Sequence, residues 1–144
     1  MTCASAVSPR IIHIAAALLL NADGQTLLVR KRATTAFMQP GGKIEAHELP
    51  VQALARELEE ELGLVIDPTQ ATFLGQFSAP AANEPGFVVQ AEIFQLTIDA
   101  EVSPAAEIEE VVWVDPATDP ALELAPLTRD LILPFYRASL TRIA

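Results

Sequence analysis

The sequence has little cysteine, few cations and only short apolar runs, and each shortage excludes a class of protein. Cys3 is the only cysteine among 144 residues, so neither an intramolecular disulfide nor a cysteine-ligated metal cluster can form. This usage fits a reducing compartment, and we expect a cytoplasmic location. The apolar run at residues 11–20 is too short for a membrane helix, which needs ~20 residues. The residues after it do not resemble a signal-peptide cleavage site, so we expect no membrane partner.

Positive charge is also scarce. Lysine and arginine together number 9 against 19 acidic residues, which gives a formal net charge of −10. Such a surface repels phosphate backbones, so we expect no nucleic acid as a partner. A nucleotide can still bind if a metal ion and a few well-placed cations assist it. Hydrophobic residues make up 51% of the chain, and this composition predicts one domain over residues 1–144, with a loose start at residues 1–9.

Apolar periodicity and turn residues divide the chain into strands and helices. The clearest helix begins at Pro50, runs to Leu62 and ends before Gly63, with an apolar stripe along one side. We expect strands at residues 11–20 and 26–32, which form a hairpin, further strands at 72–78, 87–98 and 110–114, and a C-terminal helix at 127–141 that is interrupted near Pro134. This order predicts an α+β fold, an α/β/α sandwich with a mixed β-sheet between helices.

An acidic segment of the predicted helix follows a glycine turn. Glu57, Glu60 and Glu61 share one face, because residues three and four apart are neighbours on a helix. A hard divalent cation would relieve their mutual repulsion, since Mg²⁺ prefers carboxylate oxygens. Upstream, the Pro-Gly-Gly sequence at residues 40–42 forbids regular structure and can bring a backbone carbonyl to the same ion. The alternative is a solvated acidic face, which is what a run of charges usually forms.

The spacing within residues 42–64 resembles the Nudix box. Gly42 is followed after five residues by Glu48, and after seven more by the sequence Arg-Glu-Leu-Glu-Glu-Glu-Leu-Gly-Leu at residues 56–64. The family pattern is glycine, five residues, glutamate, seven residues, and then Arg-Glu-aliphatic-any-Glu-Glu-any-Gly-aliphatic, so every specified position is met. His47 and Leu49 replace a more usual glycine and a capping residue at positions that the pattern leaves unspecified.

This resemblance implies a metal-dependent pyrophosphohydrolase, which is a hydrolase of phosphoric anhydrides. Glu57, Glu60 and Glu61 would bind Mg²⁺, with Mn²⁺ as a substitute and the carbonyl of Gly41 as a further ligand. The same three glutamates would be catalytic residues, together with Glu107, which would assist the metal or the attacking water. For Glu107 the alternative is a solvated acidic loop.

The resemblance also implies supporting and substrate-binding residues. Glu48 and Arg56 would form a structural ion pair that orients the helix. Arg32 and Lys43 lie where MutT-like members place cations against phosphate oxygens. Phe37, close to the glycine turn, is our candidate for stacking on a base, although a place in the core is the alternative.

The box sets the diphosphate chemistry and leaves the attached group open. Cations at positions 32 and 43 favour a nucleoside triphosphate, ordinary or oxidised, as the small-molecule substrate. An ADP-ribose or nucleotide-sugar pyrophosphatase is the alternative, because Pro80 lies sixteen residues past Leu64, which is typical of ADP-ribose hydrolases in the family. A non-catalytic nucleotide-sensing module is the alternative from another class, but such modules usually lose glutamates that are all present here. A homodimer is compatible with the resemblance, and no sequence feature fixes it.

Overall fold

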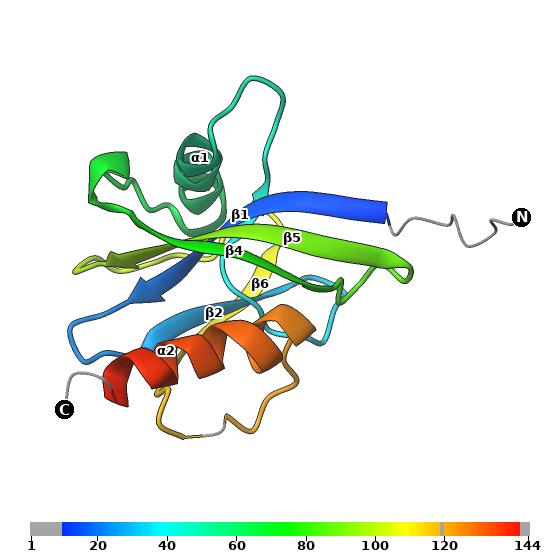
Figure 1. Cartoon of the computed structure of the whole chain (residues 1–144). Coiled ribbons are helices and arrows are strands. Elements are labelled where there is room, and N and C mark those ends of the chain that lie inside the picture. The colour runs from blue at the N-terminus through cyan, green and yellow to red at the C-terminus, as the bar shows by residue number, and fades with distance from the viewer. Residues whose placement is uncertain (1–9, 119, 142–144) are drawn as a thin grey trace, which may run out of the picture.

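The structure is a computed structural model that describes residues 10–118 and 120–141 (Figure 1). Its elements in chain order are β1 (Arg10–Leu20), β2 (Thr26–Lys31), β3 (Gly41–Lys43), α1 (Pro50–Leu62), a short 3₁₀ turn (Pro68–Gln70), β4 (Thr72–Pro80), β5 (Phe87–Thr97), β6 (Ile108–Val114), a widened helical segment (Leu127–Ile132) and α2 (Leu133–Thr141).

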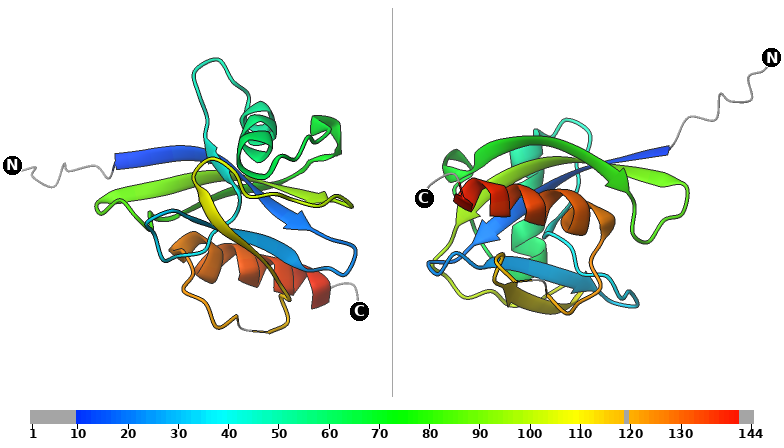
Figure 2. Two further views of the ribbon diagram at one scale, coloured as in Figure 1. Left: turned by 180° about the vertical axis from the view of Figure 1, so that it is seen from behind. Right: turned by 60° about the horizontal axis from the view of Figure 1, so that its bottom comes forward.

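The strands form one mixed sheet with helices on both faces. The strand order is β4-β5-β1-β2-β6, and β3 pairs with β1 off this path. β1 runs parallel to β5, whereas the other pairs in the sheet are antiparallel. α1 lies on one side of the sheet and α2 on the other (Figures 1 and 2). The predicted α+β class, with a mixed sheet between helices, is therefore confirmed.

Burial on both faces explains the uninterrupted apolar stretch of β1. The side chains at positions 15, 17 and 19 belong to the core against α1. Those at positions 16, 18 and 20 belong to the core that contains Leu127, Ile132 and Tyr136 from the C-terminal segment. Successive side chains of a strand point to opposite faces, so a strand covered by a helix on each side shows no polar alternation.

Helix α1 has the bounds that its sequence predicts. Leu54, Leu58 and Leu62 are completely buried and attach the helix to the sheet. Gly63 adopts a left-handed conformation with φ of 65° and donates its N–H to the carbonyl of Glu59, which ends the helix. The acidic side chains are therefore fixed relative to the sheet by the apolar packing of the same helix, and one of them, Glu61, is itself buried beside the leucines.

The glycine turn is more regular than we expected. Residues 41–43 form the short strand β3, paired with residues 14–16 of β1, and so the prediction that Pro-Gly-Gly forbids regular structure is wrong for its two glycines. Other strand ends also differ: β2 stops at Lys31, β4 extends to Pro80, β5 ends at Thr97, and β6 begins at Ile108. Of the added residues, Ala79 and Pro80 pair with β5 and Ile108 pairs with Lys31 of β2, and the local sequence carries no sign of these partners.

The C-terminal helix changes its winding near the expected proline. Over Leu127–Ile132 the helix is wider, and the N–H of Leu133 donates to the carbonyl of Thr128, five residues back. Regular α-helix begins at Leu133, directly before Pro134. Because proline has no N–H to donate, a wider turn beside it leaves no helical donor unpaired.

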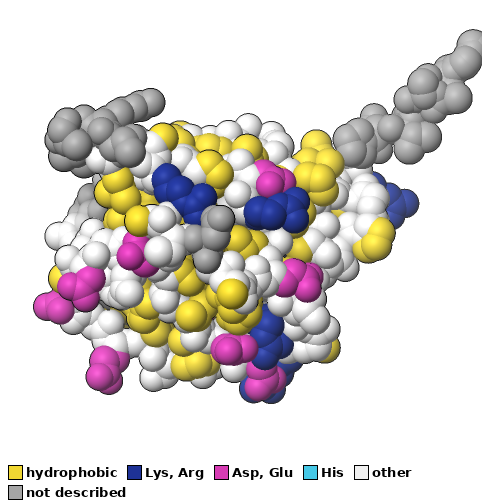
Figure 3. All heavy atoms as spheres, turned by 90° about the horizontal axis from the view of Figure 1, so that it is seen from below, with side chains coloured by type: hydrophobic (Ala, Val, Ile, Leu, Met, Phe, Trp, Pro, Cys, Tyr) yellow, Lys and Arg dark blue, Asp and Glu magenta, His cyan; other side chains and the backbone are white. Residues whose placement is uncertain are grey.

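The helices in the described ranges give no candidate for a membrane span, since none is both long and apolar enough. Figure 3 shows the face on the side of α2, where the coloured acidic and basic side chains are dispersed among apolar and polar ones. No strong patch of one sign dominates that view.

The start of α1 offers a stability test. Leu49 is the N-cap residue, extended and 61% exposed, and it has no side-chain oxygen to cap the helix, although Gln52 accepts its N–H at 2.9 Å. We expect Leu49→Ser to raise the free energy of unfolding by about 1 kcal/mol, because the serine oxygen can accept an unpaired helix N–H. Denaturant unfolding measures the change. Leu49→Ala is the matched control, and an equal gain in that variant would contradict the explanation.

Candidate active site

The glycine turn is held within the sheet rather than on a free loop. Met38 exchanges two backbone hydrogen bonds with Val29 of β2, and the N–H of Ala17 in β1 donates to the carbonyl of Pro40 at 2.9 Å. Gly41 has a φ of 147°, and a Cβ there would lie 2.2 Å from the carbonyl oxygen of Ala15. No other residue fits this close approach of two backbones.

Two helical carboxylates point at the glycines. A Cβ on Gly42 would lie 2.4 Å from Cδ of Glu57, so the missing side chain leaves the space that the Glu57 carboxyl group fills. The N–H of Gly41 donates to Oε1 of Glu61 at 3.2 Å. The segment at residues 41–42 and helix α1 thus bring Glu57 and Glu61 together, two of the three carboxylates that the sequence predicted as a group.

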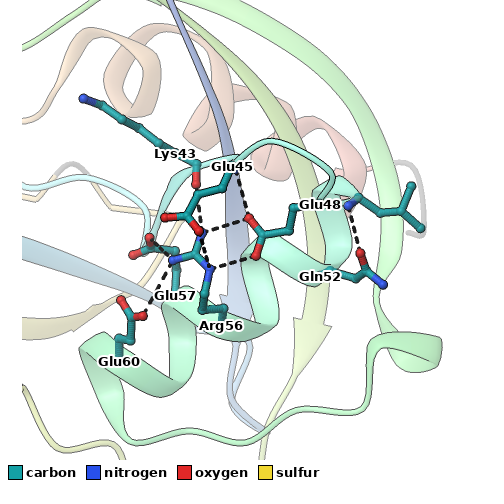
Figure 4. A network of polar contacts seen from close by, with 8 residues as sticks. Lys43, Glu45, Glu48, Gln52, Arg56, Glu57 and Glu60 are labelled. Atoms are coloured by element: carbon teal, nitrogen blue, oxygen red, sulfur yellow. Dashed lines mark hydrogen bonds and ion pairs between the residues drawn. The ribbon is translucent and has the colours of Figure 1, made fainter.

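Arg56 is the cation around which the acidic side chains gather (Figure 4). Its Nε and Nη2 atoms donate to the two carboxylate oxygens of Glu48 at 2.8 and 2.9 Å, which is the ion pair that the resemblance implied, in bidentate form. The third nitrogen, Nη1, donates to Oε2 of Glu57 at 2.8 Å, and Nη2 also donates to the carbonyl oxygen of Lys43 at 3.1 Å. One side chain therefore links the helix, the β3 strand and the loop between them.

The two partners of Arg56 differ in what they contribute. The hydrogen bond from Arg56, with the backbone N–H of Glu45 and the nearby positive charge, lowers the pKa of Glu48 to about 2. Glu48 therefore stays ionised and keeps the arginine in place. Glu57 receives a single bond from Arg56 and turns its carboxyl group toward Gly42. Its position is set by the arginine, while its oxygens remain next to the glycine turn.

Glu61 is in the opposite electrostatic situation. The residue is 6% exposed. Burial and, to a smaller extent, the nearby charge of Glu57 raise the pKa of Glu61 to about 8, against the lowering effects of the Gly41 N–H and of Lys31. A buried carboxyl group beside a like charge is unstable in its ionised form. A positive ion at this place would reverse that preference.

A cleft of about 410 Å³ opens beside these groups. Its lining combines both cationic and acidic side chains with the glycine backbone, and consists of Lys31, Gly41, Gly42, Lys43, Glu45, Glu57, Glu61, Glu84 and Glu107. Glu107 comes from the turn before β6, where its carbonyl accepts the N–H of Arg32 at 2.8 Å. Acidic residues from α1 and from the β6 entry thus share one cleft with two lysines.

Three predicted residues occupy other places. Glu60 is on the outer side of the arginine cluster, with Oε1 3.7 Å from NH1 of Arg56 and a side chain that is 55% exposed. Arg32 is 67% exposed, lies 3.9 Å from Glu109, and lines a neighbouring cavity with Glu107. Phe37 is 6% exposed and packs in the cluster formed with Leu28 and Val114, so the structure places it in a core.

Sequence reasoning missed Lys31 and Glu84 as lining residues. The sequence singled out Arg32 rather than Lys31, yet Lys31 lines the cleft and its charge lowers the pKa of Glu61. The register of β2 against β6 shifts between Arg30 and Lys31, and such a bulge redirects the side chains that follow it. Alternation along the strand could not have shown this. Glu84 lies in the loop between β4 and β5, outside any motif.

The donor set suits a hard divalent cation. Glu57 and Glu61 offer carboxylate oxygens beside the glycine backbone, which is the ligand chemistry that such an ion prefers. Within residues 10–118 and 120–141, no three acidic, histidine or cysteine side chains are already gathered as an ion site. The metal-binding roles of Glu57, Glu60, Glu61 and the Gly41 carbonyl, and the catalytic role of Glu107, stay predictions.

Comparison with known proteins places this arrangement in a family. A family model described as the NUDIX domain matches residues 10–133. An 8-oxo-dGTP diphosphatase of Haemophilus influenzae is 47% identical over 60 residues, which are 39% of this chain and 44% of that protein. A protein named octanoyltransferase from Myxococcus xanthus is 38% identical over 125 residues, 81% of this chain but 33% of its own length. The matches thus span less than half of both relatives, and their whole activities are not carried over by similarity alone.

A solved structure has the same fold. The crystal structure of a MutT protein from Methanosarcina mazei Go1 superimposes with a TM-score of 0.76 over 94% of this chain and 99% of that one, at 23% sequence identity. At this identity the likeness concerns the arrangement of strands and helices. It agrees with the sheet between two helices described above.

The buried Glu61 predicts how the metal-free protein responds to pH. Its pKa is about 8 in the folded state, against an ordinary value of 4.5, so between these values the folded protein keeps a proton that the unfolded chain releases. Stability from this group is therefore complete below pH ~4.5 and is lost as pH rises through 8, by at most about 1.4 kcal/mol per pH unit. We expect the melting temperature in EDTA to fall more steeply with pH in the wild type than in Glu61→Gln. Parallel curves for the two proteins would refute the assignment.

Proposed function

This chain belongs to the NUDIX family, and on that premise we propose that it is a divalent-cation-dependent pyrophosphohydrolase that cleaves a phosphoanhydride of a nucleoside diphosphate linked to another group. The observation that carries the proposal is the placement of Glu57 and Glu61 against Gly41 and Gly42, within a cleft that also contains two lysines. Carboxylates that bind a cation and lysines that bind phosphate oxygens are together what a diphosphate requires.

Magnesium, or manganese in its place, would be held by Glu57 and Glu61 with Glu60 as a further ligand, and it supplies charge neutralisation of the diphosphate and acidification of bound water. Arg56 positions Glu57 through its bond at 2.8 Å, and Glu48 holds Arg56 in turn. The burial of Glu61 keeps solvent from competing for its oxygens. The Gly42 position must stay free of a side chain, since any Cβ would displace the Glu57 carboxyl group.

Lys31 and Lys43 are the residues to which we assign the phosphate oxygens. They reach the cleft from β2 and β3, and so they can hold the diphosphate from two strands. Figure 4 shows the Lys43 side chain directed away from the Arg56 cluster. Glu107 lines the same cleft from the β6 entry, and we assign to it the acceptance of a proton from the attacking water. Arg32 lines the adjoining cavity and is assigned a weaker, outer contact.

A nucleoside triphosphate, ordinary or oxidised, is the substrate that we favour. The similarity to an 8-oxo-dGTP diphosphatase over 60 residues supports this choice. ADP-ribose or a nucleotide sugar is the second candidate, because Pro80 lines a small cavity next to the cleft and could contact a larger substrate there. A non-catalytic sensor is disfavoured, since Glu57, Glu60 and Glu61 are all retained.

A substrate panel tests the proposal. The purified protein is incubated with nucleoside triphosphates, 8-oxo-dGTP, ADP-ribose and nucleotide sugars in the presence of Mg²⁺, and the released phosphate, pyrophosphate, nucleoside monophosphate and sugar phosphate are measured. Release from triphosphates is the expected result. Release from ADP-ribose alone would favour the second candidate, and binding without release from any compound would favour the sensor.

Removing one charge from either cleft glutamate should abolish most turnover. We expect Glu57→Gln and Glu61→Gln to lower kcat by on the order of a hundredfold or more, because each removes an oxygen charge that a cation needs, while the fold remains intact by circular dichroism. Glu59→Gln, on the exposed side of the same helix, is the matched control. A Glu61→Gln protein that retains wild-type kcat would disprove the site.

The two adjacent cations of β2 should differ in their effect on substrate binding. We expect Lys31→Met to raise KM by about tenfold, because Lys31 lines the cleft and a lost charged hydrogen bond weakens the complex by this order. Arg32→Met should change KM by less than about threefold, since that side chain is 67% exposed and near Glu109. Steady-state kinetics on the best substrate of the panel decides. A larger increase in KM for Arg32→Met than for Lys31→Met would assign the phosphate contact to Arg32 instead.

A further inference from the structure

A buried amide in the described structure lacks one partner. Gln39 is 5% exposed. Its Oε1 accepts a hydrogen bond from the hydroxyl of Thr128 at 2.7 Å, a buried contact between segments that are 89 residues apart. Its Nε2 is also buried and has no hydrogen-bond partner among the described residues. An unpaired buried donor destabilises the protein, so this NH₂ group has a physical reason to take a partner from a ligand.

The amide faces a cavity that is otherwise apolar. The cavity measures about 60 Å³, and its other lining residues are Ile14, Ala16, Met38, Pro80, Ala82, Val89, Ala125, Leu127 and Thr128. Gln39 and Thr128 are the only residues of this lining with polar side chains, and Thr128 already uses its hydroxyl to hold Gln39. A flat, mostly apolar group with one polar edge matches such a lining.

This cavity is connected to the cleft of the proposed function. A second cavity of about 120 Å³ shares Ile14, Met38, Gln39, Ala82 and Val89 with the first, and extends to Lys31, Gly41, Gly42 and Lys43. Gln39 and Gly41 lie two residues apart in one segment, so their Cα atoms are at most about 7 Å apart. That separation is comparable with a ribose between a base and its first phosphate.

We infer that Gln39 determines base specificity by donating a hydrogen bond from Nε2 to a carbonyl oxygen of the substrate's nucleobase. The inference rests on the proposed function for its substrate class, since a phosphate held in the cleft by Lys31 and Lys43, whether that of a monophosphate or of a longer chain, places the base at Gln39. Thr128 is a positioning residue, because its hydroxyl holds Oε1 and leaves Nε2 as the unpaired donor of a side chain that lines the cavity. The site then selects a base with a carbonyl at this edge over the same base with an amino group, which offers a donor to a donor.

Pairs of nucleotides that differ at one position give a direct test. ITP and ATP differ at C6, and UTP and CTP differ at C4, where the first of each pair has a carbonyl and the second an amino group. We expect kcat/KM to favour the carbonyl member by about tenfold to a hundredfold in at least one pair. Ratios within about twofold in both pairs, or a preference for the amino member, would overturn the inference.

Variants show whether Gln39 causes the preference. Gln39→Leu should reduce the larger ratio to about one by lowering kcat/KM for the carbonyl member, and Thr128→Val should reduce it in part. Gln70→Leu, at an exposed glutamine, is the control that leaves the ratio unchanged. A Gln39→Leu protein with the wild-type ratio would refute the role of Gln39. Should Gln39→Leu fail to fold, Thr128→Val with an unchanged ratio would have the same meaning.

A binding measurement separates this inference from the proposed function. Thermal shifts of the wild-type protein with IMP and with AMP, and with UMP and CMP, are recorded in EDTA, where hydrolysis cannot occur. A larger shift with IMP or UMP supports base reading even if no nucleotide is hydrolysed, in which case the proposed function alone fails. Hydrolysis of the panel with equal shifts and equal kcat/KM within each pair would leave the function standing and remove the role of Gln39.

Discussion

The constraint on which the site depends is the gathering of negative charge around one arginine. Arg56 holds Glu48 by two bonds and Glu57 by one, and the apolar side of α1 fixes the helix that carries it. Without that cation, the glutamates of the helix would repel one another and turn toward solvent. Arg56 neutralises part of the charge, whereas Glu61 lies in a buried place where desolvation raises its pKa. Under the proposed function, a metal ion would stabilise the ionised form of that carboxyl group.

The sequence predicted the parts that depend on local pattern. The bounds of α1, the hairpin of β1 and β2, the mixed sheet and the Glu48–Arg56 pair could be derived from spacing, caps and turn residues, because these act over a few residues or a known motif. Features that depend on long-range contacts could not be predicted from the sequence in this way. The pairing of residues 41–43 with β1, the burial of Phe37 and the cleft position of Lys31 depend on which strand lies alongside, and on a bulge that no local pattern reveals.

One extended segment serves two distinct purposes. At residues 41–43 it brings glycine backbone and a lysine to the carboxylates, where charge dominates. Two residues earlier it places an amide in an apolar cavity, where a single hydrogen bond dominates. Chemistry and recognition are thus encoded by neighbouring residues with different physical surroundings. The Nudix box specifies the residues for the chemistry and leaves base recognition unspecified, because Gln39 lies outside its specified positions.

The hydrogen bonds that tie residues 38–43 to both β1 and β2 also make the site part of the sheet's cooperative unit. Many enzymes keep their reactive groups on loops that fluctuate independently of the core. Here the N–H groups of Met38 and Ile44, which donate to Val29 of β2 and His13 of β1, would exchange with solvent only when those strands separate from the segment. An increase in the flexibility of this segment alone, as in cold adaptation or altered turnover, would therefore require these hydrogen bonds to the sheet to weaken. Any such change has to be made in side chains or in the stability of the whole fold.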